Sequence, residues 1–453
     1  MVLKWVCPKP HGASSCLHTN TNPPVGKNKK QKGEINVKKI ISIALALLMV
    51  AVMLPVMAMA DDVVVEKTLT DNITQSITVN QGETCTLNLN GKTLTNEDGK
   101  DTIYVKMGGT LIINGPGTVD NVSHGRAAIF NNGTVILNGG TYTRSLEAGT
   151  AASNSDNGNS WYTICNHGDM IVNADVTVTN TGTYSSVFEN GYYNYTDNPR
   201  DERSNFVQDT NHPYPKLTIN GGTFEGGKIT IKNDDGGILE INDGRFTNNG
   251  NRVVFNVHKA VIKGGEFNCP TGYVDHRIAV DTVYSNDTTN AGQLTISGGA
   301  FNGRITKNDN SDVGITGGTF NTDVTEYTTS VLVVKDNNGK YYVGEDAKKA
   351  VENTNSGTLF VEDAGAGEAL NVKPGVTIVN NSRETIKVNG NEVAPEKSYT
   401  VPGAPIIIYP PTEDTPKAND QKNPSTGAND FVGVAAALAV VSLLGAAAVI
   451  RKK

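Results

Sequence analysis

The stretch Leu217-Thr218-Ile219-Asn220-Gly221-Gly222-Thr223-Phe224 is the most informative part of this 453-residue chain, because close copies of it recur along the sequence. In each copy, aliphatic and polar residues alternate before one or two glycines, and an aromatic residue follows. Alternation is typical of a strand with one buried face, and glycine supplies the positive φ of a sharp corner. The other clear copies are residues 135–142, 239–246, 260–267, 294–301 and 313–320.

The copies recur at a basic period near 22 residues with three longer steps, which predicts one coil per repeat and insertions at three places. Strands of stacked coils pair in parallel with the copies above and below them. We therefore expect an all-β fold in which residues 61–330 form a right-handed parallel β-helix, an elongated solenoid. A leucine-rich repeat has a similar period, but its LxxLxLxxN signature and helical segment are missing from this sequence.

Stacking also predicts that equivalent side chains of neighbouring coils meet, as they do in other in-register parallel assemblies. We expect an internal aromatic stack formed by Tyr142, Phe224, Phe246, Phe267, Phe301 and Phe320. We also expect an amide ladder formed by Asn114, Asn138, Asn220 and Asn242. Beyond the coils, residues 331–401 contain short strand patterns and one helix pattern, and we expect them to form a small C-terminal cap.

The N-terminal 60 residues have the features of an export signal. Lys38 and Lys39 precede an uncharged stretch at 40–60 that ends in Ala58-Met59-Ala60. A basic start, an apolar core and an A-x-A ending predict a signal helix that is cleaved after Ala60. The alternative is an N-terminal membrane anchor. Because residues 1–36 are polar and unpatterned, we also expect translation to start at Val37.

The C-terminus carries a second localisation signal. Residues 431–450 contain no charge, and three basic residues follow them. Twenty residues of helix span about 30 Å, which matches a bilayer core, so we expect a transmembrane helix with a cytoplasmic basic end. Before this span, residues 402–422 are rich in proline and charge and form a predicted linker to the sorting segment at 423–453.

The segment Asn423-Pro424-Ser425-Thr426-Gly427, followed by the apolar span and basic tail, resembles the LPxTG cell-wall sorting signal of Gram-positive bacteria. The resemblance implies that a sortase cleaves between Thr426 and Gly427 and links the chain to peptidoglycan. It also implies secretion, with membrane attachment through the C-terminal helix before cleavage. Asn423 departs from the usual leucine and leaves the sortase class open. The alternative is a single-pass membrane anchor without cleavage.

The opening segment at 77–94 and 109–115 resembles the start of pectate-lyase-like β-helix domains of bacterial surface proteins. The resemblance covers about residues 63–325 and implies the fold alone, because the same coil carries enzymes, adhesins and inert stalks. Residues 61–427 hold 28 of the 39 basic residues and 44 of the 46 acidic ones, a net charge of −16. Such a charge repels phosphate backbones, which argues against a nucleic-acid partner.

Cys85, Cys165 and Cys269 remain after the predicted export cleavage, without a CxxC motif. We expect three small buried side chains, or one disulfide with a spare thiol, and no structural metal. No cofactor is expected. Calcium is the one candidate ion, at the acid-rich loops 96–101 and 308–312, although neither loop fits a defined calcium-binding pattern.

Asp234 and Asp235 are the candidate catalytic residues, with Lys232 and Arg245 near them in sequence. Polysaccharide-cleaving β-helices need paired carboxylates or an acid cluster with a base. Adjacent acids on a strand point to opposite faces, so they pair only in a turn, which the next two glycines favour. The alternative is a solvated acidic corner without catalysis.

Nine of the 28 aromatic residues, Phe188 among them, lie in the double insertion between Leu146 and Lys216, which is more than the coils require. Flat aromatic side chains stack on sugar rings, so this segment is a candidate glycan-binding site. Its named candidates are Trp161, Tyr162, Tyr192, Tyr193 and Tyr195. We expect an adhesin or display protein for host or dietary glycans or proteins. The alternative function is a wall-bound polysaccharide lyase or glycoside hydrolase acting on acidic polysaccharide. If the aromatic residues of the insertion only pack against one another along the side of the β-helix, they support neither function.

Overall fold

The computed structural model describes residues 63–144, 161–182, 185–191, 215–249, 251–269, 278–283 and 292–403. The predicted signal cleavage site at Ala58 and Ala60 lies outside these residues, and so does the sorting motif at 423–427. Among the described residues, no helix is both long and apolar enough to cross a membrane. The predicted span at 431–450 is outside the ranges searched.

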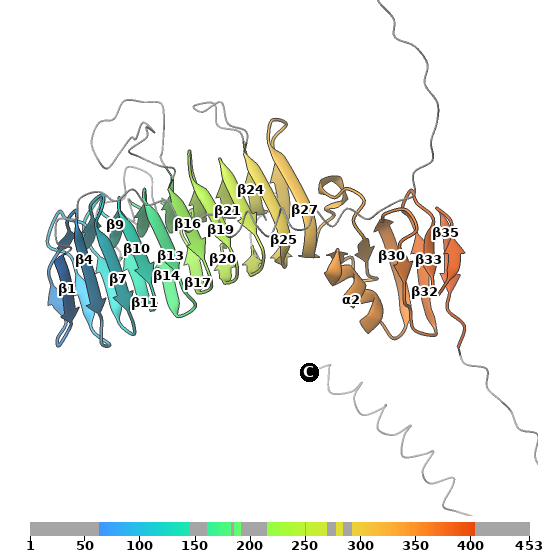
Figure 1. The fold of residues 1–453 in the computed structure, drawn as a ribbon, viewed down its shortest axis with the longest axis horizontal. Coiled ribbons are helices and arrows are strands. Elements are labelled where there is room, and N and C mark those ends of the chain that lie inside the picture. The colour runs from blue at the N-terminus through green and yellow to red at the C-terminus, as the bar shows by residue number, and fades with distance from the viewer. Residues whose placement is uncertain are drawn as a thin grey trace, which may run out of the picture.

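Each coil of the body contributes three strands, and each strand pairs in parallel with its counterpart one coil further on (Figure 1). In one coil these are β16 (Lys216–Ile219), β17 (Thr223–Gly226) and β18 (Ile229–Asn233). They pair with β19 (Ile238–Ile241), β20 (Arg245–Thr247) and β21 (Arg252–Asn256) of the next. Long parallel sheets built this way are those of a β-helix solenoid.

The first strand of each coil belongs to a large 23-stranded sheet. Besides β16 and β19, these first strands are β1 (Val63–Thr68), β4 (Glu83–Asn88), β7 (Thr110–Asn114), β10 (Thr134–Leu137), β13 (Asp169–Val172), β22 (Lys259–Ile262), β25 (Gln293–Asn302) and β27 (Asp312–Phe320). The second strands belong to the same sheet. Besides β17 and β20 they are β2 (Ile73–Thr74), β5 (Thr93–Thr95), β8 (Thr118–Asn121), β11 (Gly140–Arg144), β14 (Val176–Asn180) and β23 (Glu266–Asn268).

The third strand of each coil forms a separate nine-stranded sheet. It comprises β3 (Ile77–Val79), β6 (Ile103–Val105), β9 (Ile129–Asn131), β12 (Ile164–Asn166), β15 (Phe188–Asn190), β18, β21, β24 (Ile278–Thr282) and β26 (Arg304–Lys307). The longer steps of the repeat fall before β12, after β15 and on both sides of β24. The insertions therefore adjoin the nine-stranded sheet.

Phenylalanine rings stack through the core as the repeat predicts. Phe224, Phe246, Phe267, Phe301 and Phe320 follow one another with centroid distances of 4.7–4.9 Å and nearly parallel planes. Tyr142 is buried at the same strand position but is not part of the stack, because Val178 of the intervening coil lies between it and Phe224. The prediction was right for five of its six residues.

Two asparagine ladders run along the coils. The predicted ladder is confirmed on the surface, where side-chain amides bond at 2.8–3.0 Å and Asn88 and Asn173 extend the series Asn114, Asn138, Asn220 and Asn242. A second ladder is fully buried and runs along the C-terminal ends of β9, β12, β15, β18 and β21. It joins Asn131, Asn166, Asn190, Asn233 and Asn256 at 2.7–2.8 Å.

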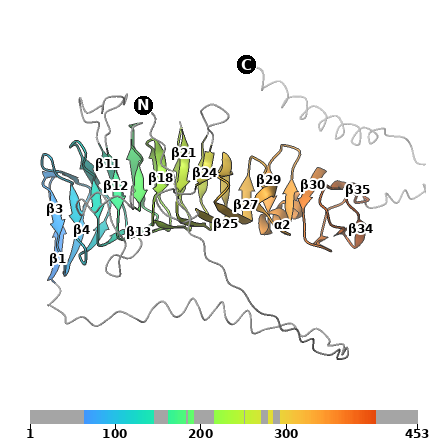
Figure 2. The ribbon, with the colours of Figure 1, turned by 90° about the horizontal axis from the view of Figure 1, so that it is seen from above.

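The region at 331–401 contains the expected short strands and one helix, around an apolar cluster of its own. Its elements are β28 (Val333–Lys335), β29 (Tyr341–Val343), α2 (Glu345–Asn353), β30 (Gly357–Asp363), β31 (Ala369–Leu370), β32 (Val376–Asn380), β33 (Ile386–Val388), β34 (Asn391–Val393) and β35 (Lys397–Thr400), after the short 3-10 helix η2 (Thr325–Tyr327). β29 pairs antiparallel with β27, so the parallel stacking of coils ends there (Figure 2).

Cys85, Cys165 and Cys269 are all buried, which confirms the first of the two expectations. Cys85 lies on β4, Cys165 on β12 and Cys269 just after β23. Cys85 and Cys269 belong to the main core, whereas Cys165 belongs to a separate small cluster. The Cys165 side chain therefore lies on the face of the nine-stranded sheet that points away from the main core.

Candidate functional site

The outward-facing row of the nine-stranded sheet contains aromatic, thiol and charged side chains that could bind or react with a ligand. One residue per strand is in register with the next along this outer row: Thr78, Tyr104, Phe130, Cys165, Glu189, Lys232, Phe255, Asp281 and Thr306. Their strand neighbours, such as Phe188 and Ile231, belong to the main core. Because successive side chains of a strand alternate between faces, the outer row points away from that core.

The first half of the outer row is aromatic and apolar. Phe130 and Cys165 are fully buried in a small cluster against which Tyr104, Trp161 and Tyr162 pack. Trp161 and Tyr162 meet edge to face with centroids 5.5 Å apart, and both are only partly buried. Two of the predicted glycan-stacking residues are thus brought together over the outer row. Tyr192, Tyr193 and Tyr195 lie outside the described residues.

One aromatic of the insertion belongs to the core and not to a loop. The sequence count included Phe188 among the surplus aromatics, and that assignment was wrong. Phe188 is completely buried on β15 and meets Phe224 at 6.5 Å. It occupies an inward position of the nine-stranded sheet, in register with the core residues Ile164 and Ile231.

The second half of the outer row holds its charged residues, Glu189, Lys232 and Asp281. The Lys232 ammonium forms an ion pair with the Asp234 carboxylate, and their side chains are only 13% and 8% exposed. Lys232 also donates to the Tyr162 hydroxyl at 3.5 Å and lies 5.8 Å from the centre of its ring. The lysine therefore connects the aromatic pair to the acidic turn.

Asp234 and Asp235 occupy a tight turn, as the following glycines indicate. The Asp234 N–H donates to the Asn190 carbonyl at 2.7 Å, and the Gly237 N–H donates to the Asp234 carbonyl at 3.0 Å. Both aspartates are buried, so the alternative of a solvated acidic corner is wrong. Arg245 is not near them, because it lies on β20 of the large sheet and pairs with Glu266 at 2.9 Å.

Glu189 is the residue of this site that sequence reasoning missed. It is 3% exposed and lies between Cys165 and Lys232 in the outer row. Burial, with a smaller contribution from Asp234, raises the pKa of its carboxyl to about 7, although Lys232 and the Cys165 thiol oppose this shift. A carboxyl that binds a proton near neutral pH is suited to general acid catalysis. The signal available in the sequence was the pattern of an apolar residue, any residue and asparagine that these strands share.

Glu189 makes stability depend on pH. Its folded pKa lies above the unfolded value, so the native state binds the extra proton and stability falls as pH rises from about 4.5 to about 7. We expect this decrease to be on the order of 3 kcal/mol. Glu189→Gln should remove it, as measured by urea unfolding at pH 4.5 and pH 8. Equal pH dependence in both proteins would contradict the assignment.

The described residues offer little for a metal ion. No group of three or more His, Cys, Asp or Glu side chains within them is placed to hold one. In the loop at 96–101, Asp101 accepts the Ala127 N–H at 2.8 Å and Asn96 donates to Ser123 at 2.7 Å. In the loop at 308–312, Ser311 donates to Asn308 at 2.6 Å. Calcium binding at these loops stays a prediction.

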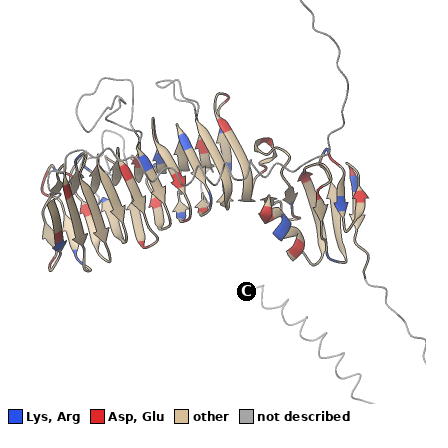
Figure 3. Cartoon of the chain, viewed as in Figure 1, with Lys and Arg blue, Asp and Glu red and all other residues tan. Residues whose placement is uncertain are grey.

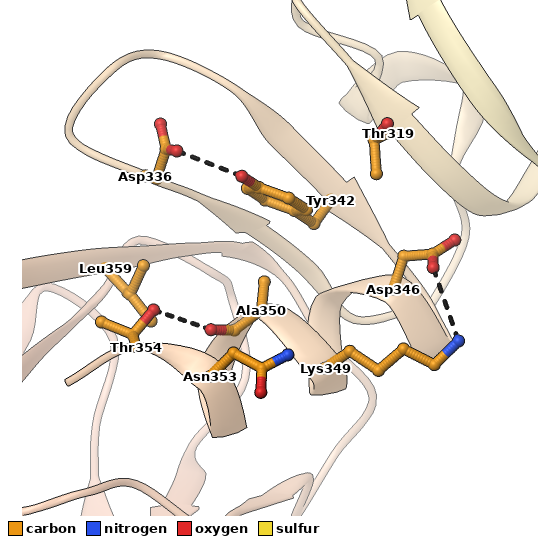
Figure 4. A pocket seen from close by; sticks show the side chains of 9 residues that line it. All are labelled: Thr319, Asp336, Tyr342, Asp346, Lys349, Ala350, Asn353, Thr354 and Leu359. Carbon is orange, nitrogen blue, oxygen red and sulfur yellow. Dashed lines mark hydrogen bonds and ion pairs between the residues drawn. The ribbon is translucent and has the colours of Figure 1, made fainter. Parts of the chain in front are cut away.

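A pocket of about 380 Å³ lies where the last coil meets the C-terminal region (Figure 4). The Tyr342 hydroxyl donates to Asp336 at 3.2 Å on one wall, and α2 supplies Asp346 and Lys349 on another. Asp346 also accepts the Gly318 N–H at 3.0 Å, which fastens the start of α2 to β27. These polar groups therefore stabilise the junction between the last coil and the C-terminal region through hydrogen bonds.

Comparison with known proteins gives no relative from which a function can be transferred. No family model matches the sequence, no curated protein is significantly similar to it, and no solved structure matches the fold. Function therefore rests on the residues of this chain.

Proposed function

We propose that this chain is a secreted bacterial surface protein that a sortase links to peptidoglycan at Thr426. It displays a right-handed parallel β-helix, which residues 331–401 cap, and it binds glycan on the outer row of the nine-stranded sheet. The tripartite C-terminal sequence supports the anchor. Connections between parallel strands are almost always right-handed, which supports the handedness. The antiparallel β27–β29 pairing supports the cap.

The pair Trp161–Tyr162 is the observation that carries the glycan-binding proposal. Both rings are partly exposed beside Lys232, a donor in reach of the Tyr162 hydroxyl. A sugar presents an apolar ring face to an aromatic and hydroxyls to polar groups, and this arrangement offers both. Acidic and basic residues are interspersed along the described coils (Figure 3), which favours a neutral ligand over a polyanion.

Trp161→Ala should weaken glycan binding at least tenfold, about 1.4 kcal/mol, because it removes one stacking surface. The measurement is retention of the purified mature chain on arrays of host and dietary glycans, followed by titration of any ligand retained. Tyr399→Ala is the matched control, since Tyr399 is also a partly buried aromatic residue but lies on β35. Loss of binding in both variants, or in neither, would argue against this site.

Polysaccharide cleavage is the alternative, and one observation favours it: the raised pKa of Glu189 beside the Lys232–Asp234 pair. The burial of Glu189 favours binding without catalysis, because a substrate needs access to the acid. Incubation with pectin, mucin and glycosaminoglycan separates the two. New reducing or unsaturated ends, lost in both Glu189→Gln and Asp234→Asn, would make the protein an enzyme.

A further inference from the structure

The two ends of the coil stack are finished differently. At the C-terminal end, β29 pairs with the last coil. At the other end, β1 pairs only with β4 among the described strands, so its second edge is open (Figures 1 and 2). Val63, Val64 and Val65 of this strand are 59%, 72% and 36% exposed. Solenoids need a cap at each end, and an apolar open edge is a template for another strand.

The backbone shows which groups face the open edge. The N–H groups of Val63 and Leu69 donate to carbonyls of the next coil, at Gly82 just before β4 and at Asn88 of β4, at 3.1 and 3.0 Å. Because N–H groups alternate in direction along a strand, those of Val64, Glu66 and Thr68 point away from β4. Ile73 and Ile77 are partly buried against the core at the same end. Edge hydrogen bonds and apolar side chains therefore coincide.

We propose that the β1 edge binds the β1 edge of a second copy of this chain, in antiparallel register about a two-fold axis. The inference rests on the proposed export cleavage, which leaves only Asp61 and Asp62 before β1, too short a segment to cover the edge. When the outward groups of Val64 bond to those of Val64 in the other copy, Val63 lies opposite Val65 and Asp61 lies opposite Lys67. Asp62 then lies opposite Glu66, whereas a parallel partner in register sets every acid against the same acid. Because the far end is already paired with β29, the assembly closes at two copies.

The experiment uses the chain that both processing steps leave, residues 61–426. We expect sedimentation at micromolar concentration to give twice the monomer mass. Val64→Pro removes one edge N–H and keeps the β4 ladder, so it should raise the dimer dissociation constant at least tenfold without changing circular dichroism. Val64→Thr, which keeps the N–H, is the matched control and should dimerise within about threefold of the parent chain.

A Val64→Cys variant gives a second measurement that does not depend on proline. The native thiols of the described residues are buried, so oxidation should cross-link two copies through residue 64. A variant that stays unlinked after oxidation would contradict the proposal. A monomer at all concentrations, a dimer insensitive to Val64→Pro, or open-ended polymers would overturn the proposal. N-terminal mass spectrometry of the exported chain tests the cleavage separately. A retained leader refutes the processing step, and a cleaved chain that stays monomeric refutes edge pairing.

Discussion

Replacing Phe267 with alanine should destabilise the coil stack by about 3–5 kcal/mol, the largest loss we expect from one core substitution. The ring is fully buried and lies between Phe246 and Phe301, at centroid distances of 4.8 and 4.7 Å. Its removal leaves a cavity and exposes one face of each neighbouring ring. Because coils lend stability mainly to their nearest neighbours, the loss should appear as a lower denaturant midpoint.

Phe255→Ala is the control for that measurement. Phe255 is also a phenylalanine on a central coil, but it belongs to the outer row and is only partly buried, with the Arg252 guanidinium 5.5 Å from its ring centre. Its loss should cost no more than about 1.5 kcal/mol. If both variants lose a similar free energy of unfolding, the phenylalanine stack contributes no more to stability than a partly buried phenylalanine does.

The large sheet was predictable from sequence because its strands carry a long periodic signal. In β16, Leu217 and Ile219 are buried while Thr218 is not, and the glycine corner follows at the expected place. Tyr142 misled the prediction because a coil with Val178 at the equivalent position lies between it and the phenylalanines. Coils stack in chain order, so the aromatic stack is interrupted wherever a degenerate coil, such as the one with Val178, carries no aromatic residue at this position.

The nine-stranded sheet was missed because its strands are mostly short and contain no glycine corner. Cys165, Glu189 and Lys232 follow no common residue type, and their position appears only when the strands are in register. From the sequence alone, the buried asparagines would be expected on the surface, because asparagine is polar. They are tolerated in the core because each amide bonds to the next coil and to backbone carbonyls, as Asn190 does with Ile238 at 3.2 Å.

The same reason explains the error about Asp234 and Asp235. Two adjacent acids followed by glycines are usually solvated, since an unpaired buried carboxylate is costly. Here Lys232 lies two residues earlier on β18 and pairs with Asp234, and the coil below provides the Asn190 carbonyl for the turn. Only the stacking of coils brings this second contact, so residue spacing alone did not reveal the burial.

Thr426→Ala should move most of the protein from the cell-wall fraction to the membrane fraction, the largest effect on localisation that we expect. The proposed reaction breaks the Thr426–Gly427 bond as a sortase thiolate binds the Thr426 carbonyl carbon, and a peptidoglycan amine then displaces the enzyme. With alanine at 426 the apolar span at 431–450 stays attached and retains the chain in the bilayer. The measurement is immunoblotting of fractionated cells.

Ser425→Ala is the matched control, because the position between proline and threonine varies in the motif this segment resembles, and this variant should remain wall-bound. Mass spectrometry of the parent wall fraction should show a peptide that ends at Thr426 and carries a cross-bridge amine. If the parent chain stays in the membrane with residues 427–453 attached, the single-pass anchor is correct. The β-helix would then still face outward, because the basic residues 451–453 hold the opposite end of the span in the cytoplasm.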